Sequence, residues 1–370
     1  MKVRMFHWAC VCAMLGLVGA ISSAQAAEGD NWVQKVNLSG DFRYRHEYID
    51  QKDVINTNQR HRLRARTKMD VRVSDDLKYV MQLSTGTFET TSTNQTLDGN
   101  YDKKFVDFDM MYIDWSAASS SHVLAGKVKN TLYTPGGSEL LWDADVTFEG
   151  VTWNWEPASK GMPYFVNVGG YWFDERNGEG AGNAQHSDTL QVSAQVGTEL
   201  SAQGHKIVAG LGYHTFSAMK NHTATTANGN STTGGGNYLY GFDILELFAS
   251  VDTDVANQPA QIYFNYASNS AASNNGSAYL LGINFKKLKT KGDWTIGYNY
   301  RNVEADSVVG ALTESDFAAG ETNSRGHKIQ AQYQLASAVV GGFTYHKCQR
   351  NVSTVSTDYD RMQLDLNFKF

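Results

Sequence analysis

Cysteine is almost absent from this 370-residue sequence, which contains only 3. Cys10 and Cys12 lie close to the N-terminus, and Cys348 is the one cysteine in the rest of the chain. The main part of the chain therefore has no disulfide framework and no thiolate metal site. A nucleophile-elbow motif, a Gly-rich phosphate loop and paired metal-binding histidines are also missing. We therefore expect no enzyme activity, no cofactor and no metal.

Proline, an excess of positive charge and long apolar runs are lacking as well. The chain has 4 Pro and a net charge of −6, which argues against general binding of nucleic acid. Beyond the N-terminal segment, no stretch approaches the roughly 18 uncharged apolar residues of a transmembrane helix. The chain has instead 34 Gly, 19 Tyr, 17 Phe and 8 Trp, a composition that favours strands over helices.

The first 26 residues have the pattern of a secretory signal peptide. Lys2 and Arg4 precede a short apolar stretch, and small residues at Ala24 and Ala26 fit a cleavage site after residue 26. The apolar stretch is too short for a membrane anchor and ends at this site. We expect residues 27–370 to be exported as one domain, which is more negative than the whole chain because Lys2 and Arg4 are removed.

Apolar and polar residues alternate over segments of about ten residues through the rest of the chain. The C-terminus shows this most clearly. One face carries Met362, Leu364, Leu366, Phe368 and Phe370, and the other carries Arg361, Gln363, Asp365, Asn367 and Lys369. In a transmembrane barrel, the apolar face contacts lipid and the polar face lines the lumen.

Sixteen such segments can be distinguished, and the connections between them alternate between short and long. The pattern predicts an all-β protein, a transmembrane antiparallel β-barrel of about 16 strands with short periplasmic turns and long extracellular loops. Asp114 interrupts the alternation of one segment, and the segment 237–249 has apolar residues on both faces. The predicted segments are 36–48, 60–73, 77–87, 104–115, 122–128, 146–156, 164–174, 188–199, 205–215, 237–249, 260–268, 278–288, 292–303, 325–335, 338–347 and 359–370.

A row of basic residues follows the polar faces of the first, second and last segments, which become neighbours when the barrel closes. An arginine facing lipid at the bilayer midplane costs about 2–4 kcal/mol, so we expect this row to line a wet lumen and influence ion flow. A salt-bridge network inside a plugged barrel is the alternative. The row comprises Arg43, Arg45, Arg62, Arg64, Arg66, Lys68, Arg72, Arg361 and Lys369, against Asp41, Glu47, Asp70 and Asp365, an excess of five positive charges.

The long connection 129–145 differs from the other loops because it contains apolar and aromatic residues of its own, such as Leu140 and Trp142. A loop with such anchors usually packs on something, and we expect it to fold into the lumen as a constriction. Glu139, Asp143 and Asp145 would then be constriction acids near the basic row. An ordinary surface loop is the alternative.

The terminal residue, Phe370, lies on an alternating strand. An aromatic residue at this position resembles the sorting signal that barrel-assembly machinery recognises in many outer-membrane proteins. We therefore expect Phe370 to act as an assembly signal.

Two stretches near the N-terminus, Ser39–Arg45 and Gln59–Arg66, resemble the start of the putative-porin family of proteobacteria. The stretch from Ala125-Gly126-Lys127 to Trp142-Asp143, followed by Glu149-Gly150-Val151, is similar to the third-loop region of that family. The resemblance implies a 16-stranded diffusion pore and gives no particular solute. Homotrimer formation is common among classical porins, and the resemblance carries it over as an expectation.

We therefore expect an outer-membrane porin for passive diffusion of small hydrophilic solutes and ions. The basic row should draw anions while the loop acids temper the effect, which predicts a weak anion preference or nearly none. Expected partners are outer-membrane lipid and lipopolysaccharide, the barrel-assembly machinery and the solutes. Two alternatives remain: an outer-membrane enzyme, and a plugged structural barrel without conductance.

Overall fold

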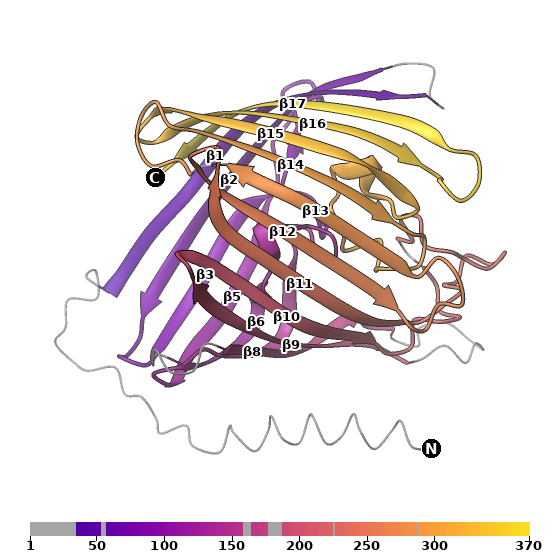
Figure 1. Ribbon diagram of the computed structural model, residues 1–370, viewed down its shortest axis with the longest axis horizontal. Coiled ribbons are helices and arrows are strands. Elements are labelled where there is room, and N and C mark those ends of the chain that lie inside the picture. The colour runs from indigo at the N-terminus through magenta and orange to yellow at the C-terminus, as the bar shows by residue number, and fades with distance from the viewer. Residues whose placement is uncertain (1–34, 53–56, 158–163, 177–186, 225, 286) are drawn as a thin grey trace.

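A computed structural model of the chain describes residues 35–52, 57–157, 164–176, 187–224, 226–285 and 287–370 (Figure 1). The strands form one antiparallel sheet that closes into a barrel, because β1 pairs with both β2 and β17. The predicted signal peptide, residues 1–26, lies outside the described residues. Within the described residues, no helix is long and apolar enough to cross a membrane.

Sixteen long strands make up the wall of the barrel, and each pairs with its neighbours in chain order. They are β1 (Val36–Gln51), β2 (Asn58–Arg72), β3 (Leu77–Thr85), β5 (Val106–Ala118), β6 (Ser121–Lys129), β7 (Thr147–Trp155), β8 (Tyr164–Asp174), β9 (Thr189–Ala202), β10 (His205–Phe216), β11 (Phe242–Val255), β12 (Gln258–Asn269), β13 (Ser277–Phe285), β14 (Trp294–Val303), β15 (Ser324–Ala336), β16 (Val339–Arg350) and β17 (Thr357–Lys369).

Three short elements complete the described structure. The two-residue strand β4 (Gln95–Thr96) pairs with Arg62 and Leu63, and so continues the ladder beside β2 beyond the pairing with β3. The 3-10 helix η3 (Pro135–Gly137) lies in the connection between β6 and β7, and η4 (Phe317–Gly320) lies between β14 and β15.

The prediction of sixteen alternating strands is confirmed, and so is the assignment of their faces. On β17, Leu364 and Leu366 are exposed on the outer surface, whereas Gln363 is buried inside the barrel. On β12, which pairs with β11 and β13, Ile262 and Phe264 are exposed on the outer surface, whereas Asn265 is buried. An outward apolar face and an inward polar face are the arrangement of a membrane barrel.

The structure explains why apolar and polar residues alternate poorly in the sequences of β5 and β11. In β5, a register shift opposite Gln82 and Leu83 leaves Asp109 as an extra residue, a β-bulge that switches the facing of the side chains. In β11, Leu245 faces outward, while Ile244 and Phe248 are buried inside against loop residues. The inner face of β11 therefore carries apolar residues on which a loop packs, together with the buried polar residues Glu246 and Ser250.

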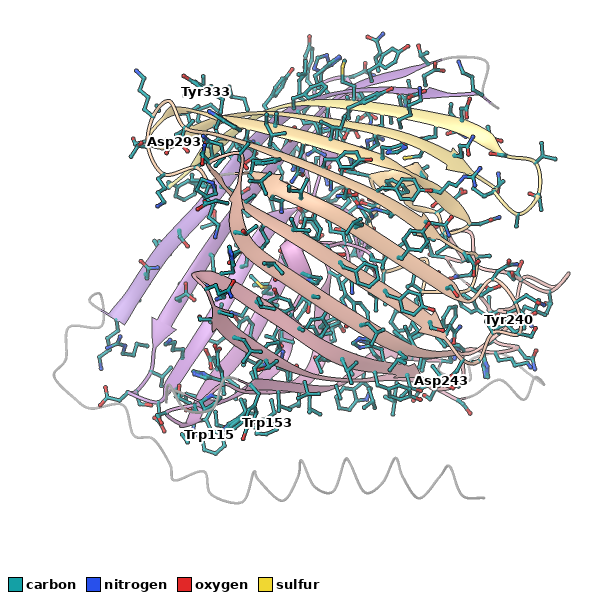
Figure 2. All side chains as sticks on the ribbon, viewed as in Figure 1. Trp115, Trp153, Tyr240, Asp243, Asp293 and Tyr333 are labelled. Atoms are coloured by element: carbon teal, nitrogen blue, oxygen red, sulfur yellow. The ribbon has the colours of Figure 1, made fainter. Side chains whose placement is uncertain are left out.

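The two ends of the barrel differ, as predicted. Short turns join β2 to β3, β5 to β6 and β15 to β16 at one end, and the long connections lie at the other (Figure 1). Trp115 and Trp153 lie close together at the short-turn end, both beside Val123, and Tyr240 lies at the long-loop end (Figure 2). We call these ends the short-turn end and the long-loop end.

The hydrophobic core lies between one part of the barrel wall and three connections, one of which, between β10 and β11, contributes Met219 and Tyr238. Leu140, Trp142 and Leu312 come from the connections, and Phe148 and Ile244 come from the wall. Burial of each large apolar side chain contributes about 1.5–3 kcal/mol. The core therefore fixes the connections against β5–β13, and the polar part of the interior lies toward β14–β17 and β1–β3.

Candidate functional site

The basic row lies on the inner faces of β1, β2 and β17, in register across the seam where the barrel closes. Arg43 is opposite Arg64, and Arg45 is opposite Arg62. Arg45 is also opposite Asp365 of β17, and its Nε lies 2.7 Å from the Asp365 Oδ1. The alternation of each strand thus places successive arginines on one wall of the interior.

The members of the basic row differ in their partners, which are acidic for some and neutral for others. Arg64 and Arg66 share Asp41, each at 2.8 Å, and Lys68 pairs with Asp70 at 2.9 Å. Arg62 is buried, with its guanidinium against Ser92 and the Asn94 carbonyl. Arg43 donates to the Asn94 Oδ1 at 2.6 Å, and Arg72 lies opposite Lys78 near the short-turn end.

The connection between β6 and β7, residues 130–146, lies inside the barrel, and we call it the crossing segment. Its Tyr133 donates its backbone N–H to Gln195 of β9 at 2.7 Å, and its hydroxyl lies 2.7 Å from that of Ser250 on β11. Ser138 donates to Asn265 of β12 at 2.9 Å. These contacts are with inward-facing side chains, so the segment runs along the inner wall.

The three acids of the crossing segment are spread along it. Glu139 forms an ion pair with Lys328 of β15 at 3.0 Å, and Asp145 lies 3.4 Å from Arg66 and 3.8 Å from Arg64. Asp143 accepts the Ser315 N–H at 2.8 Å.

The surroundings of Asp143 disfavour its ionised form. Burial, together with the neighbouring Glu139 and Asp145 carboxylates, raises the pKa of Asp143 well above its usual range, although the N–H groups of Ser315 and Asp145 oppose the shift. Asp145 is the acid of this segment that directly faces the predicted arginines.

A second connection, residues 304–323 between β14 and β15, also lies inside the barrel, and we call it the latch segment. Thr313 donates to the Leu140 carbonyl at 2.9 Å, and the Asp143 N–H donates to the Leu312 carbonyl at 2.7 Å. Glu314 pairs with Arg301 and Lys328.

Sequence reasoning placed the latch segment among the outer loops and so missed Glu314 and Asp316. The signal was present, because Val308, Val309 and Leu312 are apolar anchors of the same kind as those of the crossing segment.

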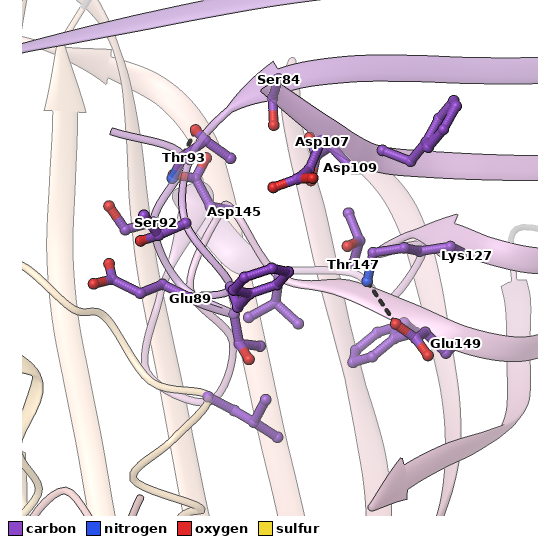
Figure 3. A pocket seen from close by; sticks show the side chains of 18 of the residues that line it. Ser84, Glu89, Ser92, Thr93, Asp107, Asp109, Lys127, Asp145, Thr147 and Glu149 are labelled. Atoms are coloured by element: carbon purple, nitrogen blue, oxygen red, sulfur yellow. Dashed lines mark hydrogen bonds and ion pairs between the residues drawn. The ribbon is translucent and has the colours of Figure 1, made fainter. Parts of the chain in front are cut away.

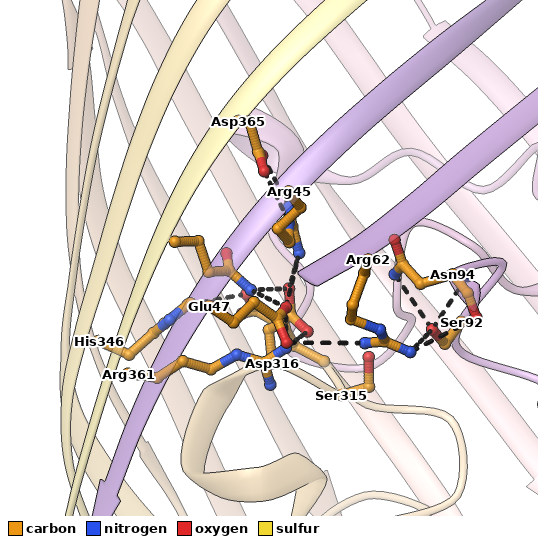
Figure 4. Close-up of polar contacts among 12 residues, drawn as sticks. Arg45, Glu47, Arg62, Ser92, Asn94, Ser315, Asp316, His346, Arg361 and Asp365 are labelled. Carbon is orange, nitrogen blue, oxygen red and sulfur yellow. Dashed lines mark hydrogen bonds and ion pairs between the residues drawn. The ribbon is translucent and has the colours of Figure 1, made fainter. Parts of the chain in front are cut away.

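The tip of the latch segment reaches the basic row. The Asp316 carboxylate accepts from Arg361 at 2.7 Å, Arg45 at 3.0 Å and Gln363 at 2.8 Å (Figure 4). Burial by itself would raise the pKa of Asp316, but the Arg361 and Arg45 guanidiniums hold it well below its usual range. Asp316 is therefore a carboxylate that the row keeps ionised.

A carboxylate on the barrel wall also compensates the positive charge of these arginines. Glu47 is fully buried and pairs with Arg361 and Arg60, both at 2.6 Å. The excess of five positive charges predicted for this wall is therefore reduced, because Asp145 and Asp316 from the two inner segments both contact it.

Three cavities lie around these groups. A cavity of about 540 Å³, which we call the wide cavity, extends from Arg45 and Asp316 to Ser337 and Lys369 at the short-turn end. A cavity of about 340 Å³, the outer cavity, is lined by Gln51, Arg60 and Arg361 at the long-loop end. Ser315 borders both, so the tip of the latch segment separates them.

The third cavity, of about 430 Å³, lies on the other side of Asp145, and we call it the acidic cavity (Figure 3). Lys127 and Glu149 form an ion pair at 2.8 Å on its lining, and Lys127 is its one basic residue among the described residues. Its carboxylates are Glu89, Asp107, Asp109, Asp145 and Glu149. Asp145 thus stands between an arginine-lined space and an acidic one.

The site has the chemistry of a charged passage. Amides and hydroxyls such as Gln330, Gln332 and Thr344 share the wide cavity with the ionised groups. The described residues contain no group of three or more His, Cys, Asp or Glu side chains placed to hold a metal ion. Such surfaces hydrate and guide small polar solutes.

Comparisons with known proteins agree with this geometry. The model of a family described as "Putative porin" matches residues 47–239 and 240–370. No curated protein matches the chain.

Several solved structures are similar over most of their length. Pseudomonas putida OprB at high pH is 10% identical with a TM-score of 0.63, and the match covers 91% of this chain and 95% of that one. A Salmonella typhi OmpF complex with daunomycin is 11% identical with a TM-score of 0.53, over 90% and 97% of the two chains. A variant of Rh. blastica porin is 12% identical with a TM-score of 0.52, over 90% and 100%. At these identities the likeness concerns the fold.

Proposed function

The chain belongs to the putative-porin family, a family of channels for passive diffusion, and we propose that its narrowest part lies where the crossing segment meets the basic row. The observation that carries this proposal is the approach of Asp145 to Arg66 and Arg64, at 3.4 and 3.8 Å, beside the wide cavity. Small hydrophilic solutes and ions would pass through the wide cavity beside these paired charges.

The family and the fold are those of porin channels, which supports a location in the outer membrane. We propose that the chain is exported with a cleaved signal peptide and works without catalysis or cofactor. Its surroundings would be outer-membrane lipid and lipopolysaccharide.

The proposed ion selectivity is weak, with a slight preference for anions. Among the described residues, six basic and seven acidic side chains line the wide cavity, so their fields nearly cancel, and the surroundings of Asp143 disfavour its ionised form. The outer cavity has Arg60 and Arg361 among its described lining residues and no acid, which favours entry of anions from the long-loop end.

Replacing Arg64 and Arg66 together with glutamine is expected to shift selectivity toward cations. Asp41 and Asp145 would lose the guanidiniums that compensate them, so the local charge becomes negative. The zero-current potential across a planar bilayer in a salt gradient measures the shift. The shift should shrink at 1 M salt, where the screening length is about 3 Å instead of about 10 Å at 0.1 M.

Arg72→Gln is the matched control, because Arg72 lies on the same strand outside the lining of the three cavities described above. It removes one positive charge of the same row and should leave the potential close to that of the unaltered protein. An unchanged potential in the double variant would place Arg64 and Arg66 outside the conduction path.

We propose that Phe370 serves in assembly more than in the finished fold. Its side chain is largely exposed, while its backbone pairs with Gly40 of β1 through two hydrogen bonds, of 2.9 and 3.1 Å. Deletion of Phe370 is expected to slow insertion by the barrel-assembly machinery and to leave precursor in the periplasm. Cell fractionation after a pulse of expression tests this, and normal outer-membrane amounts at early times would contradict it.

We also propose a homotrimer. Phe88 and Tyr101, in the connection between β3 and β5, are fully exposed in the single chain, and exposed large apolar residues often mark an interface. The mass of the purified protein in detergent micelles tests the stoichiometry.

A further inference from the structure

The carboxylate of Asp316 is held by three donors that do not belong to its own segment. Arg361 and Gln363 come from β17 and Arg45 comes from β1, and their nitrogens lie 2.7, 2.8 and 3.0 Å from the two carboxylate oxygens (Figure 4). Two guanidiniums and an amide that converge on one carboxylate are the usual donors of an anion-binding site.

The donors are held in place without Asp316. Arg45 binds the Asp365 carboxylate through two nitrogens, at 2.7 and 2.8 Å, which leaves its third nitrogen for Asp316. Arg361 and Gln363 both also donate to Glu47, at 2.6 and 3.2 Å. The arrangement would therefore persist if the Asp316 side chain turned away.

The strands keep a positive charge at this place. Four guanidiniums meet only two strand carboxylates, which leaves an excess of two positive charges before Asp316 is counted and of one after it. The guanidiniums are those of Arg45, Arg60, Arg62 and Arg361, and the carboxylates are those of Glu47 and Asp365.

The position of Asp316 is open to solutes. Its side chain is one-quarter exposed and lines the wide cavity, and Ser315 beside it borders both the wide and the outer cavity. A rotation of the Asp316 side chain into the wide cavity would free the three donors without moving the rest of the latch segment, which Thr313 and Glu314 anchor.

We propose that Arg45, Arg361 and Gln363 form a binding site for the carboxylate of small organic acids, and that Asp316 occupies this site as a competitor built into the chain. The inference rests on the proposed channel, because solutes reach the site through the two cavities. A solute carboxylate replaces the Asp316 carboxylate on the same donors, and no covalent bond changes. Asp316 thereby lowers the affinity of the site so that a bound acid can leave again.

Block of the chloride current by acetate in planar bilayers tests the proposal, with acetamide as the uncharged probe of the same shape. If Asp316 occupies the site for nine-tenths of the time, removing it strengthens the apparent affinity about tenfold. Asp316→Asn and Asp316→Ser should therefore both lower the half-blocking acetate concentration by about that factor. Acetamide should have no effect on any of the proteins.

Two further variants make the result specific. Glu321→Gln removes an acid of the same segment that pairs with Arg350, and it should leave the half-blocking concentration unchanged. Adding Gln363→Leu to Asp316→Asn removes one of the three donors and should reverse much of the gain. The mobility of unheated protein on a denaturing gel checks that each variant is folded.

Equal half-blocking concentrations in the unaltered protein and both Asp316 variants would overturn the inference while leaving a conducting channel. A chloride current that changes without any change in acetate block would also overturn it, since Asp316 would then be only a fixed charge. If the unaltered protein carried no current, the proposed function would be wrong, and this inference would fall with it.

Discussion

Replacing Ile329 with arginine is expected to prevent stable assembly of the barrel. Ile329 lies near the middle of β15 with its side chain on the outer surface, two-fifths exposed, where it would contact lipid. An arginine at the midplane of the lipid face costs about 2–4 kcal/mol. Because whole domains are stable by only about 5–15 kcal/mol, this is a large share of the total.

Gln330→Arg is the matched control for this prediction. Gln330 is the next residue of the same strand, but its side chain lines the wide cavity, where water solvates the added charge. The folded fraction of each variant in lipid vesicles, measured by gel mobility before and after heating, compares the two. Equal loss of folding in both variants would mean that the two faces of β15 are wrongly assigned.

Replacing Trp142 with alanine is expected to destabilise the protein and to loosen the crossing segment. Trp142 is buried inside the barrel, with its ring 5.3 Å from that of Phe148 and 5.1 Å from that of His214. Truncation of a buried tryptophan to alanine costs about 3–5 kcal/mol. The loss falls on the packing between the segment and the wall, so the single-channel current should also become noisier.

Trp172→Ala removes a side chain of the same size from the outer surface, where Trp172 is mostly exposed. It should cost much less in the free energy of unfolding, measured by guanidinium titration of the protein in micelles. A smaller loss for Trp142→Ala than for Trp172→Ala would contradict the packing of the crossing segment described above.

The strands could be predicted from the sequence because side-chain facing in a barrel repeats every two residues. All sixteen segments were found this way, although β11 runs from Phe242 to Val255 instead of 237–249. Its inner face mixes Ile244 and Phe248, which pack against the crossing segment, with the polar Glu246 and Ser250, so the pattern there lacks a uniformly polar side. Alternation therefore fails where a loop covers the wall.

The charged interior could be predicted only in part. The row from Arg43 to Arg66 follows from alternation and from the pairing of β1 with β2. The partners of the row do not follow, because Asp316 reaches it from a segment more than 250 residues away in the chain, through contacts that no local pattern encodes. Arg62, predicted as part of the pore lining, lies behind Ser92 and Asn94 and is absent from the lining of the wide cavity.

The central claim is that a wet path runs through this barrel past Arg64, Arg66 and Asp145. The most direct test is the current through single molecules of the purified, unaltered protein in a planar lipid bilayer. We expect step-like currents that rise linearly with voltage and with salt concentration, and a zero-current potential in a salt gradient that is close to zero or slightly on the anion side. Folded, inserted protein that carries no current would contradict the claim, and would mean that the crossing and latch segments close the lumen.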